Sequence, residues 1–208
     1  MVETTGTRAE GVEEREVKLA VTDDFVLPPL SDLDGRVAVD AGEQLLRSVY
    51  WDTDDLQLAR AGVGVRHRNG IWAFKGRSRR EGDAVVREEL EVAGDADSVP
   101  SQVRARLEKW VDPHSVHPVA LLDTLRRTVD ITDGSARAEL VHDRVSVVDG
   151  KRVVARFDEV EVEFNAASSA LAERVVNLLK AHGAVVDTRP KYMRALGFLG
   201  HDPPDLTT

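Results

Sequence analysis

The stretch Val12-Glu13-Glu14-Arg15-Glu16-Val17-Lys18-Leu19-Ala20 places three charged residues, Glu14, Glu16 and Lys18, at alternate positions. If the stretch is a strand, its period of two puts these charges on one face, and Val17 and Leu19 on the other can join a core. Two acids and a lysine that point inward are costly to bury without partners. A metal ion and a polyanion are partners of this kind, and a solvent-facing edge strand is the ordinary alternative.

Composition narrows the class of protein. The 208 residues suit one sizeable domain or two small ones, and 42% hydrophobic with 31% charged residues is typical of a globular protein. A net charge of −9 argues against general binding of nucleic acid or anionic membranes, which needs a basic surface. There are no cysteines, so any metal must be held by oxygen or imidazole ligands. Carboxylates favour Mg²⁺, Mn²⁺ or Ca²⁺, and none of the six histidines forms a tight metal-binding spacing.

No apolar run approaches the length of a transmembrane helix, and the first residues lack a signal-peptide core. A cytoplasmic location is therefore the default expectation. The polar composition of residues 1–11 predicts a disordered N-terminus, and residues 200–208 resemble a tail or linker. The folded domain is expected to span 12–199.

The periodicity predicts an α+β domain, mostly of antiparallel strands with a few helices. Asn69-Gly70 is a strong type I′ turn signal between two strands. Residues 77–83 are charged and are expected to be mobile. Strands are expected at 12–21, 37–39, 44–53, 63–68, 71–75, 84–92, 120–132, 136–148 and 152–164, and helices near 54–61, 97–110, 168–182 and 190–199.

Several expected strands carry charge at every second position, notably Arg66 and Arg68, Arg87 with Glu89 and Glu91, and Glu159 with Glu161 and Glu163. Each could be the solvated face of an ordinary antiparallel sheet. Taken together they favour another arrangement, because like charges on one face oppose each other unless a cation lies between them. A closed barrel with a polar interior would gather the acids around divalent cations. Its arginines and lysines would hold phosphate oxygens.

This ordered series resembles the CYTH superfamily, also called triphosphate tunnel metalloenzymes, over about residues 12–199. The resemblance implies a closed eight-stranded antiparallel β-barrel, the triphosphate tunnel, with helices packed outside. The matching residues are, in order, Glu14-x-Glu16-x-Lys18, Tyr50-Trp51-Asp52-Thr53 with Leu58, Arg66-x-Arg68, Lys75, Glu89-x-Glu91, Arg126-Arg127, Asp143, Glu161-x-Glu163 and Lys191-Tyr192.

The resemblance also implies roles for these residues. Glu16 and Lys18 are the expected catalytic residues. Strand parity favours Arg126 over Arg127 inside the tunnel, because Arg127 shares its face with Val129 and Ile131. The implied metal ligands are Glu14, Glu16, Glu89, Glu91, Asp143, Glu161 and Glu163, and the implied substrate-binding residues are Lys18, Arg66, Arg68, Lys75, Arg87, Arg126, Arg127 and Lys191.

The implied activity is hydrolysis of triphosphate compounds with Mg²⁺ or Mn²⁺, with inorganic tripolyphosphate as the preferred substrate. Thiamine triphosphate and nucleoside triphosphates are the alternative substrates. A polyphosphate-binding module with little turnover, joined to a C-terminal CHAD domain, is a second hypothesis, and an adenylyl cyclase is a third. Members of the class IV adenylyl cyclase branch usually have a His-Phe pair shortly before the first motif. This chain has Val12-Glu13 there, which disfavours a cyclase. Pro190 also stands where family members often have Ser, so the chain departs from the family pattern beside Lys191. We expect no nucleic-acid or membrane partner, and a monomer or homodimer.

Overall fold

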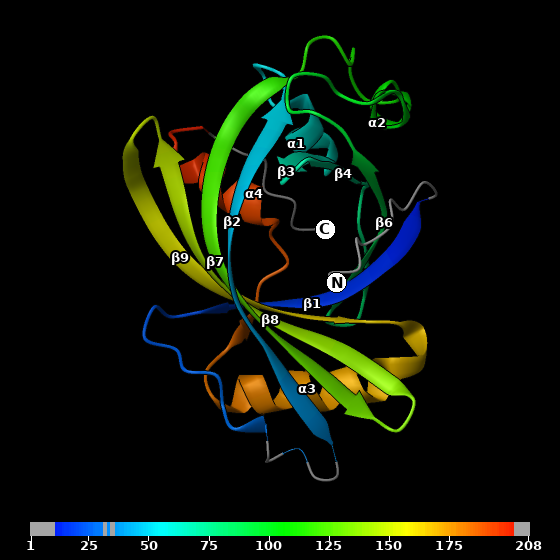
Figure 1. Cartoon of the computed structure of the whole chain (residues 1–208), viewed down its shortest axis with the longest axis vertical. Coiled ribbons are helices and arrows are strands. Elements are labelled where there is room, and N and C mark those ends of the chain that lie inside the picture. Colours follow the sequence, from blue (N-terminus) through cyan, green and yellow to red (C-terminus); the bar gives the residue numbers. More distant parts are fainter. Residues whose placement is uncertain (1–10, 31–32, 34–35, 202–208) are drawn as a thin grey trace, which may run out of the picture.

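Long antiparallel strands of alternating apolar and charged residues dominate the structure (Figure 1). This computed structural model describes residues 11–30, 33 and 36–201, so most of the predicted disordered N-terminus and of the predicted tail lies outside the described residues. The strands are β1 (Val12–Val21), β2 (Val37–Asp52), β3 (Gly64–Arg68), β4 (Ile71–Lys75), β5 (Arg79–Glu81), β6 (Ala84–Ala93), β7 (His117–Asp133), β8 (Ala136–Asp149), β9 (Arg152–Phe164) and β10 (Val185–Val186).

Short helices connect and cover these strands. None of the described helices is long and apolar enough to cross a membrane. The helices are α1 (Gln57–Ala61), α2 (Ser101–Leu107), the 3₁₀ turn η2 (Ala166–Ser168), α3 (Ser169–Ala181) and α4 (Lys191–Phe198).

Eight of the described strands close into an antiparallel barrel in the order β1-β9-β8-β7-β2-β3-β4-β6. The first strand closes the ring, because Val12–Glu16 pair with β6 while Glu16–Val21 pair with β9. β5 and β10 extend the sheet beside β6 and β1 without joining the ring. The predicted α+β class and closed eight-stranded antiparallel barrel are thereby confirmed.

The register of the strands gathers the charged residues on the inner face. Residues directly opposite in an antiparallel pair point to the same side of the sheet. Glu16 lies opposite Glu163, and Lys18 opposite Glu161. Arg126 lies opposite Asp143 on the next pair of strands. The charge alternation seen in the sequence is therefore the lining of the barrel.

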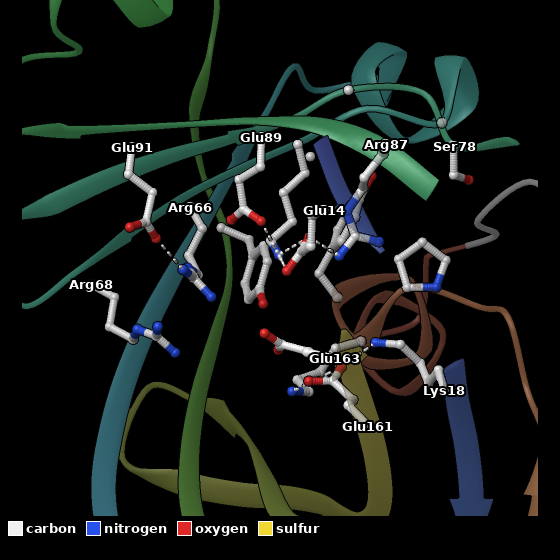
Figure 2. Close-up of a pocket in the computed structure, with 18 of the residues that line it drawn as sticks. Glu14, Lys18, Arg66, Arg68, Ser78, Arg87, Glu89, Glu91, Glu161 and Glu163 are labelled. Atoms are coloured by element: carbon white, nitrogen blue, oxygen red, sulfur yellow. Dashed lines mark hydrogen bonds and ion pairs between the residues drawn. The ribbon is translucent and has the colours of Figure 1, made fainter. Parts of the chain in front are cut away.

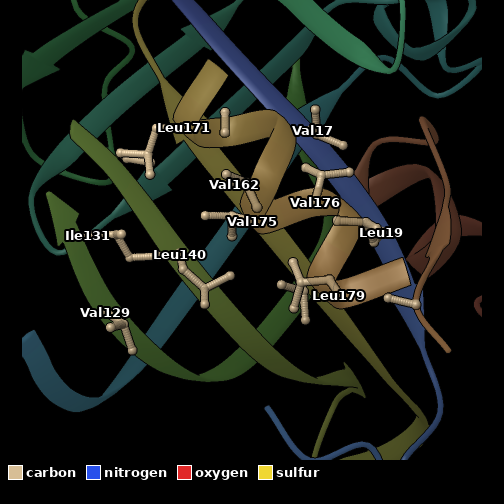
Figure 3. Close-up of a cluster of buried hydrophobic side chains, with 14 of the residues drawn as sticks. Val17, Leu19, Val129, Ile131, Leu140, Val162, Leu171, Val175, Val176 and Leu179 are labelled. Carbon is tan, nitrogen blue, oxygen red and sulfur yellow. The ribbon is translucent and has the colours of Figure 1, made fainter. Parts of the chain in front are cut away.

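Much of the apolar side of these strands lies outside the barrel, beneath α3. Leu171, Val175 and Leu179 recur every fourth residue, which puts them on one helix face. All three are buried against the strands, among residues that include Val17 and Leu19 (Figure 3). Gly183, with φ of 97°, follows the end of the helix, and its N–H donates to the carbonyl of Lys180.

Helix α4, unlike α3, packs against the inner face of the barrel strands. Leu122 and Val145 lie on the same strand faces as Arg126 and Asp143, and α4 packs on them with Tyr192 and Leu196. The Tyr192 ring stacks on that of Tyr50 at 5.2 Å between centroids, and its hydroxyl donates a 2.6 Å hydrogen bond to the carbonyl of Val63. Apolar packing thus fills the part of the interior beside the charged lining.

A third cluster covers the outer side of β3, β4 and β6. Trp72, fully buried, and Phe74 pack there with Val103 and Leu107 of α2. Two short strands were missed by the sequence reading. The segment expected to be mobile contains β5, which folds back on β6 around Gly82 at φ of 63°, and β10 is only two residues long.

Candidate active site

A charged cavity of about 410 Å³ runs through the barrel interior. Figure 2 shows carboxylates and cations projecting into it from opposite walls, with Arg68 and Glu91 toward one end and Ser78 and Lys18 toward the other. Its charged lining comprises Glu14, Lys18, Arg66, Arg68, Lys75, Arg87, Glu89, Glu91, Arg126, Glu139, Glu161, Glu163 and Lys191.

Three carboxylates, Glu14, Glu16 and Glu163, meet where β1 lies beside β9. They offer oxygen atoms that all lie within 4.8 Å of one another. Burial, together with the charges of Glu161, Glu14 and Glu16, raises the pKa of Glu163 to about 8. Glu16 Oε1 is buried without a hydrogen bond among the described residues. This group therefore carries more negative charge than its surroundings satisfy, which is what a divalent cation relieves.

Arg87 and Lys75 neutralise part of this group. Arg87 reaches Glu14 at 2.8 Å and Glu16 at 2.9 Å. Lys75 bridges Glu14 and Glu89, with Nζ 3.1 Å from an oxygen of each. Burial alone would raise the pKa of Glu89, but the nearby charges of Lys75, Arg66 and Arg87 and a hydrogen bond with Glu14 lower it to about 2. Glu89 is thus an ion-pair partner at neutral pH.

A second group of acids, Asp143, Glu159 and Glu161, is buried beneath the cavity and also brings its oxygens within 4.8 Å of one another. Cations of the chain already occupy it. Lys18 Nζ lies 2.5 Å from Glu161, and Lys191 contacts Asp143. Burial alone would raise the pKa of Glu161, but Lys18 and Lys191, with Arg126, hold it well below its usual range. These acids are paired far more completely than the first group.

The wall built by Arg126, Arg66 and Arg68 is rich in cations. Arg126 donates to both oxygens of Asp143, at 2.8 and 2.6 Å, in the bidentate geometry that guanidinium favours. Arg66 lies 3.6 Å from Glu91, whereas Arg68 forms no ion pair at contact distance in the described part of the chain, and Glu91 acts on it only from farther away. Burial and the neighbouring Arg66 and Arg126 lower the pKa of Arg68 to about 10, so it stays cationic at neutral pH. An unpaired cation in a cavity is suited to an anionic ligand.

The CYTH family model matches residues 13–187, which span nearly the whole barrel. The chain belongs to the CYTH family. Members of this family are triphosphate tunnel metalloenzymes, which agrees with a barrel interior lined by both acids and cations. No curated protein matches the chain by sequence.

Solved structures share the fold of this CYTH domain at low sequence identity. A candidate adenylate cyclase from Bacillus halodurans is 20% identical, with a TM-score of 0.59 over 86% of this chain and 95% of that one. A candidate adenylyl cyclase from Hippeastrum, described as having a dominant triphosphatase activity, is 17% identical. Its TM-score is 0.58 over 92% and 98% of the two chains. Both likenesses concern the fold.

The CYTH barrel brings the predicted site residues together with one exception. Glu16 and Asp143 are buried just behind the cavity surface, in contact with Arg87, Arg126 and Lys191. The exception is Arg127, whose side chain is 45% exposed on the outer surface and pairs with Asp40 at 2.7 Å. It belongs to the face of Val129 and Ile131, as strand parity indicated, and it does not line the cavity.

Three charged residues of the CYTH interior were not in the predicted set. Glu139 lines the cavity, and burial, with Asp130 and Glu161 nearby, raises its pKa. Glu159 lies in the second acid group, and Arg194 of α4 lies 3.4 Å from it. Glu159 shares the alternation of Glu161 and Glu163, so the pattern already held this signal. For Arg194 the only signal in the sequence was weak, namely its position about one helical turn after Lys191.

Proposed function

We propose that this CYTH domain hydrolyses triphosphate compounds in a reaction that depends on a divalent metal, with inorganic tripolyphosphate as the preferred substrate. The observation that carries the proposal is the asymmetry of the cavity. An under-neutralised group of carboxylates lies beside the cavity that Arg68 lines: Glu14 and Glu163 line the same cavity, and Glu16 is buried just behind its surface. The triphosphatase activity of the Hippeastrum neighbour supports the same class of substrate.

The cations of the lining would bind the phosphate oxygens. Arg66, Arg68 and Arg126 form one wall, and their planar forks can each donate two hydrogen bonds to a phosphate. Lys75 and Lys191 offer point charges from the other elements. All five now face carboxylates or each other, so binding a polyanion would exchange internal ion pairs for contacts to substrate.

The carboxylates that fit a divalent metal are those of Glu14, Glu16 and Glu163. Glu161, which lies opposite Lys18 in the pair of β1 and β9, can serve as a further ligand. The oxygens lie close enough together, and all the ligand atoms are hard oxygens that suit Mg²⁺ or Mn²⁺. The buried Oε1 of Glu16 forms no hydrogen bond among the described residues, although Arg87 pairs with it at 2.9 Å. When bound, such an ion would neutralise phosphate charge and polarise the scissile bond.

Lys18 and Glu16 remain the proposed catalytic residues. Burial alone would lower the pKa of Lys18, but Glu159, Glu161 and Glu16 raise it well above its usual range. Lys18 therefore stays cationic throughout and can stabilise the charge that spreads over the phosphoryl oxygens as the bond breaks. Glu16 lies two residues before Lys18 on the same face of β1, where it would help to bind the metal.

Phosphate release should be measured over a panel of tripolyphosphate, thiamine triphosphate, ATP and longer polyphosphate with Mg²⁺ or Mn²⁺. We expect release from tripolyphosphate that EDTA abolishes and added metal restores. Full activity in chelator would overturn the metal-dependent reading. Binding of polyphosphate without release would favour a binding module, such as one linked to a CHAD domain, and cyclic AMP formed from ATP would favour a cyclase.

A further inference from the structure

Glu159 is a fully buried carboxylate of the barrel interior. Its side chain is 0% exposed and it does not line the cavity. One oxygen, Oε1, lies 3.4 Å from Nζ of Lys18 and 3.1 Å from Nζ of Lys191. Both lysines line the cavity, so Glu159 connects them from behind.

The other oxygen of Glu159 is held from a different direction. Arg194 Nη1 lies 3.4 Å from Oε2. The guanidinium also lies over the ring of Phe157, 4.0 Å from its centroid, a cation–π contact that fixes its plane. Arg194 follows Lys191 by three residues on α4, so one helix face presents both cations to the same carboxylate.

Three carboxylates of this buried group, Asp143, Glu159 and Glu161, face four cations, Lys18, Arg126, Lys191 and Arg194. Lys18 also lies 3.9 Å from Glu16. Among these cations, Arg194 is the one that does not line the cavity. Without Arg194, Oε2 of Glu159 would lose its cation and could accept from the lysines as well.

We propose that Arg194 is a positioning residue that acts through Glu159. By holding Oε2, it leaves only Oε1 to the two lysines, so that their ammonium groups stay at the cavity wall with donors free for substrate phosphates. This rests on the proposed function only in taking a triphosphate as the ligand of those lysines. Arg194 does not itself touch the substrate.

The test is a double-mutant cycle read by binding. Affinity for a non-hydrolysable triphosphate with Mg²⁺ would be measured calorimetrically for the parent, Arg194→Met, Glu159→Gln and the double variant. Methionine keeps an unbranched side chain on Phe157 without the charge. We expect Arg194→Met to weaken binding about tenfold and to raise KM by a similar factor, with kcat changed less than about threefold. Arg194→Lys should recover most of the affinity.

The decisive comparison is the Glu159→Gln background, because residues that act through one another are not additive. There, Arg194→Met should change affinity by less than about twofold. A full tenfold loss in that background would mean that Arg194 acts on the substrate directly, and an unchanged Arg194→Met single variant would mean that it has no role in binding. Either result overturns the proposal. If Arg194→Met does not fold, Arg194→Gln takes its place in the cycle.

A matched control is Arg174→Met on α3, which removes an exposed arginine paired with Asp133 at 2.6 Å and should leave affinity unchanged. A loss of affinity there equal to that of Arg194→Met would mean that net charge alone sets binding, which also overturns the positioning role. A parent protein that binds no triphosphate overturns the proposed function as well. Tight parental binding with additive variants overturns the positioning role alone.

Discussion

Glu163 shows how strongly the barrel changes a single side chain. Its pKa rises to about 8 from an ordinary 4.5, because it is buried among Glu161, Glu14 and Glu16. An acid whose pKa is raised by folding keeps its proton while the unfolded chain loses it. The metal-free protein therefore loses stability as pH rises from about 4.5 to 8, and the loss is complete above that range.

Glu163→Gln should remove this pH-dependent cost in the metal-free protein. At pH 8 we expect the variant to have a free energy of unfolding about 1–2 kcal/mol above the parent, after allowance for partial solvent access. Near pH 4.5 the difference should vanish. Urea unfolding in chelator at both pH values measures it. A difference that is the same at both would show that the charge of Glu163 is not its source.

Arg68 is the best single probe of substrate binding at the cation-rich wall. Arg68→Ala should weaken binding of a non-hydrolysable triphosphate with metal by about 2 kcal/mol, a typical value for a charge-assisted contact. Arg68→Lys should recover only part of this, since the bidentate fork is lost. Arg127→Ala is the control, because Arg127 lies on the outer surface. Equal affinity of Arg68→Ala and the parent would place Arg68 outside the binding site.

For single residues, the sequence predicted the strand face on which a side chain lies better than it predicted the residues that the side chain contacts. Alternation placed Glu14, Glu16 and Lys18 on one face, and parity separated Arg126 from Arg127, because a strand offers only two faces. It could not predict the contact between Arg194 and Glu159, since that depends on how α4 docks against β9.

Helix α4 is the element on which the shape of the site depends. It supplies Lys191 and Arg194 to the charged group and packs Tyr192 and Leu196 on the interior apolar cluster. Its first residue follows Pro190, which also lines the cavity and suits the start of a helix. The family difference at Pro190 therefore leaves Lys191 in contact with Asp143.

Tyr192→Phe should weaken the packing of α4 through the loss of one hydrogen bond, while the aromatic ring is kept. The ring can still stack on Tyr50, but the buried carbonyl of Val63 loses its donor. We expect the free energy of unfolding to fall by about 1–2 kcal/mol, as for other buried groups left unpaired. Denaturant titration measures this. No change in stability would mean that water replaces the hydroxyl.

Elements long enough to repeat their hydrophobic period several times were predictable from sequence, and short elements were not. The α3 stripe of Leu171, Val175 and Leu179 repeats over enough turns to identify a helix. β5 and β10, with three and two residues, carry no period of their own and exist because β6 and β1 offer them an edge. Likewise β2 was expected as two strands, but it continues through a bulge between Asp40 and Gly42.

The whole molecule places charge inside and much of its apolar packing outside. Its three apolar clusters lie beneath α3, around α4 and beneath α2, and the charged lining runs between them. The acids and cations of opposite walls hold one another in the absence of ligand. A metal and a triphosphate would replace these pairs by contacts that span several strands at once.

Thermal stability should therefore rise most when both ligands are present. At a free concentration about 100 times Kd, a ligand that binds only the folded state adds about 2.7 kcal/mol. A non-hydrolysable triphosphate with Mg²⁺ should raise Tm more than the sum of either added alone. Thermal unfolding monitored by circular dichroism measures the effect. Simple additivity of the two shifts would indicate that metal and phosphate bind independently.

Closure of the ring by β1 has a consequence for synthesis of the chain. β1 is made first, yet its partners within the ring are residues 85–89 of β6 and 158–163 of β9. During translation, the acids Glu14 and Glu16 must wait until more than a hundred further residues have left the ribosome before their strand can be enclosed. Pairings so distant in sequence fold slowly, because a long loop must close before they form. The emerging chain therefore holds the edge of its first strand that pairs with β9 open for most of its synthesis, and that is the interval in which a chaperone would act on it.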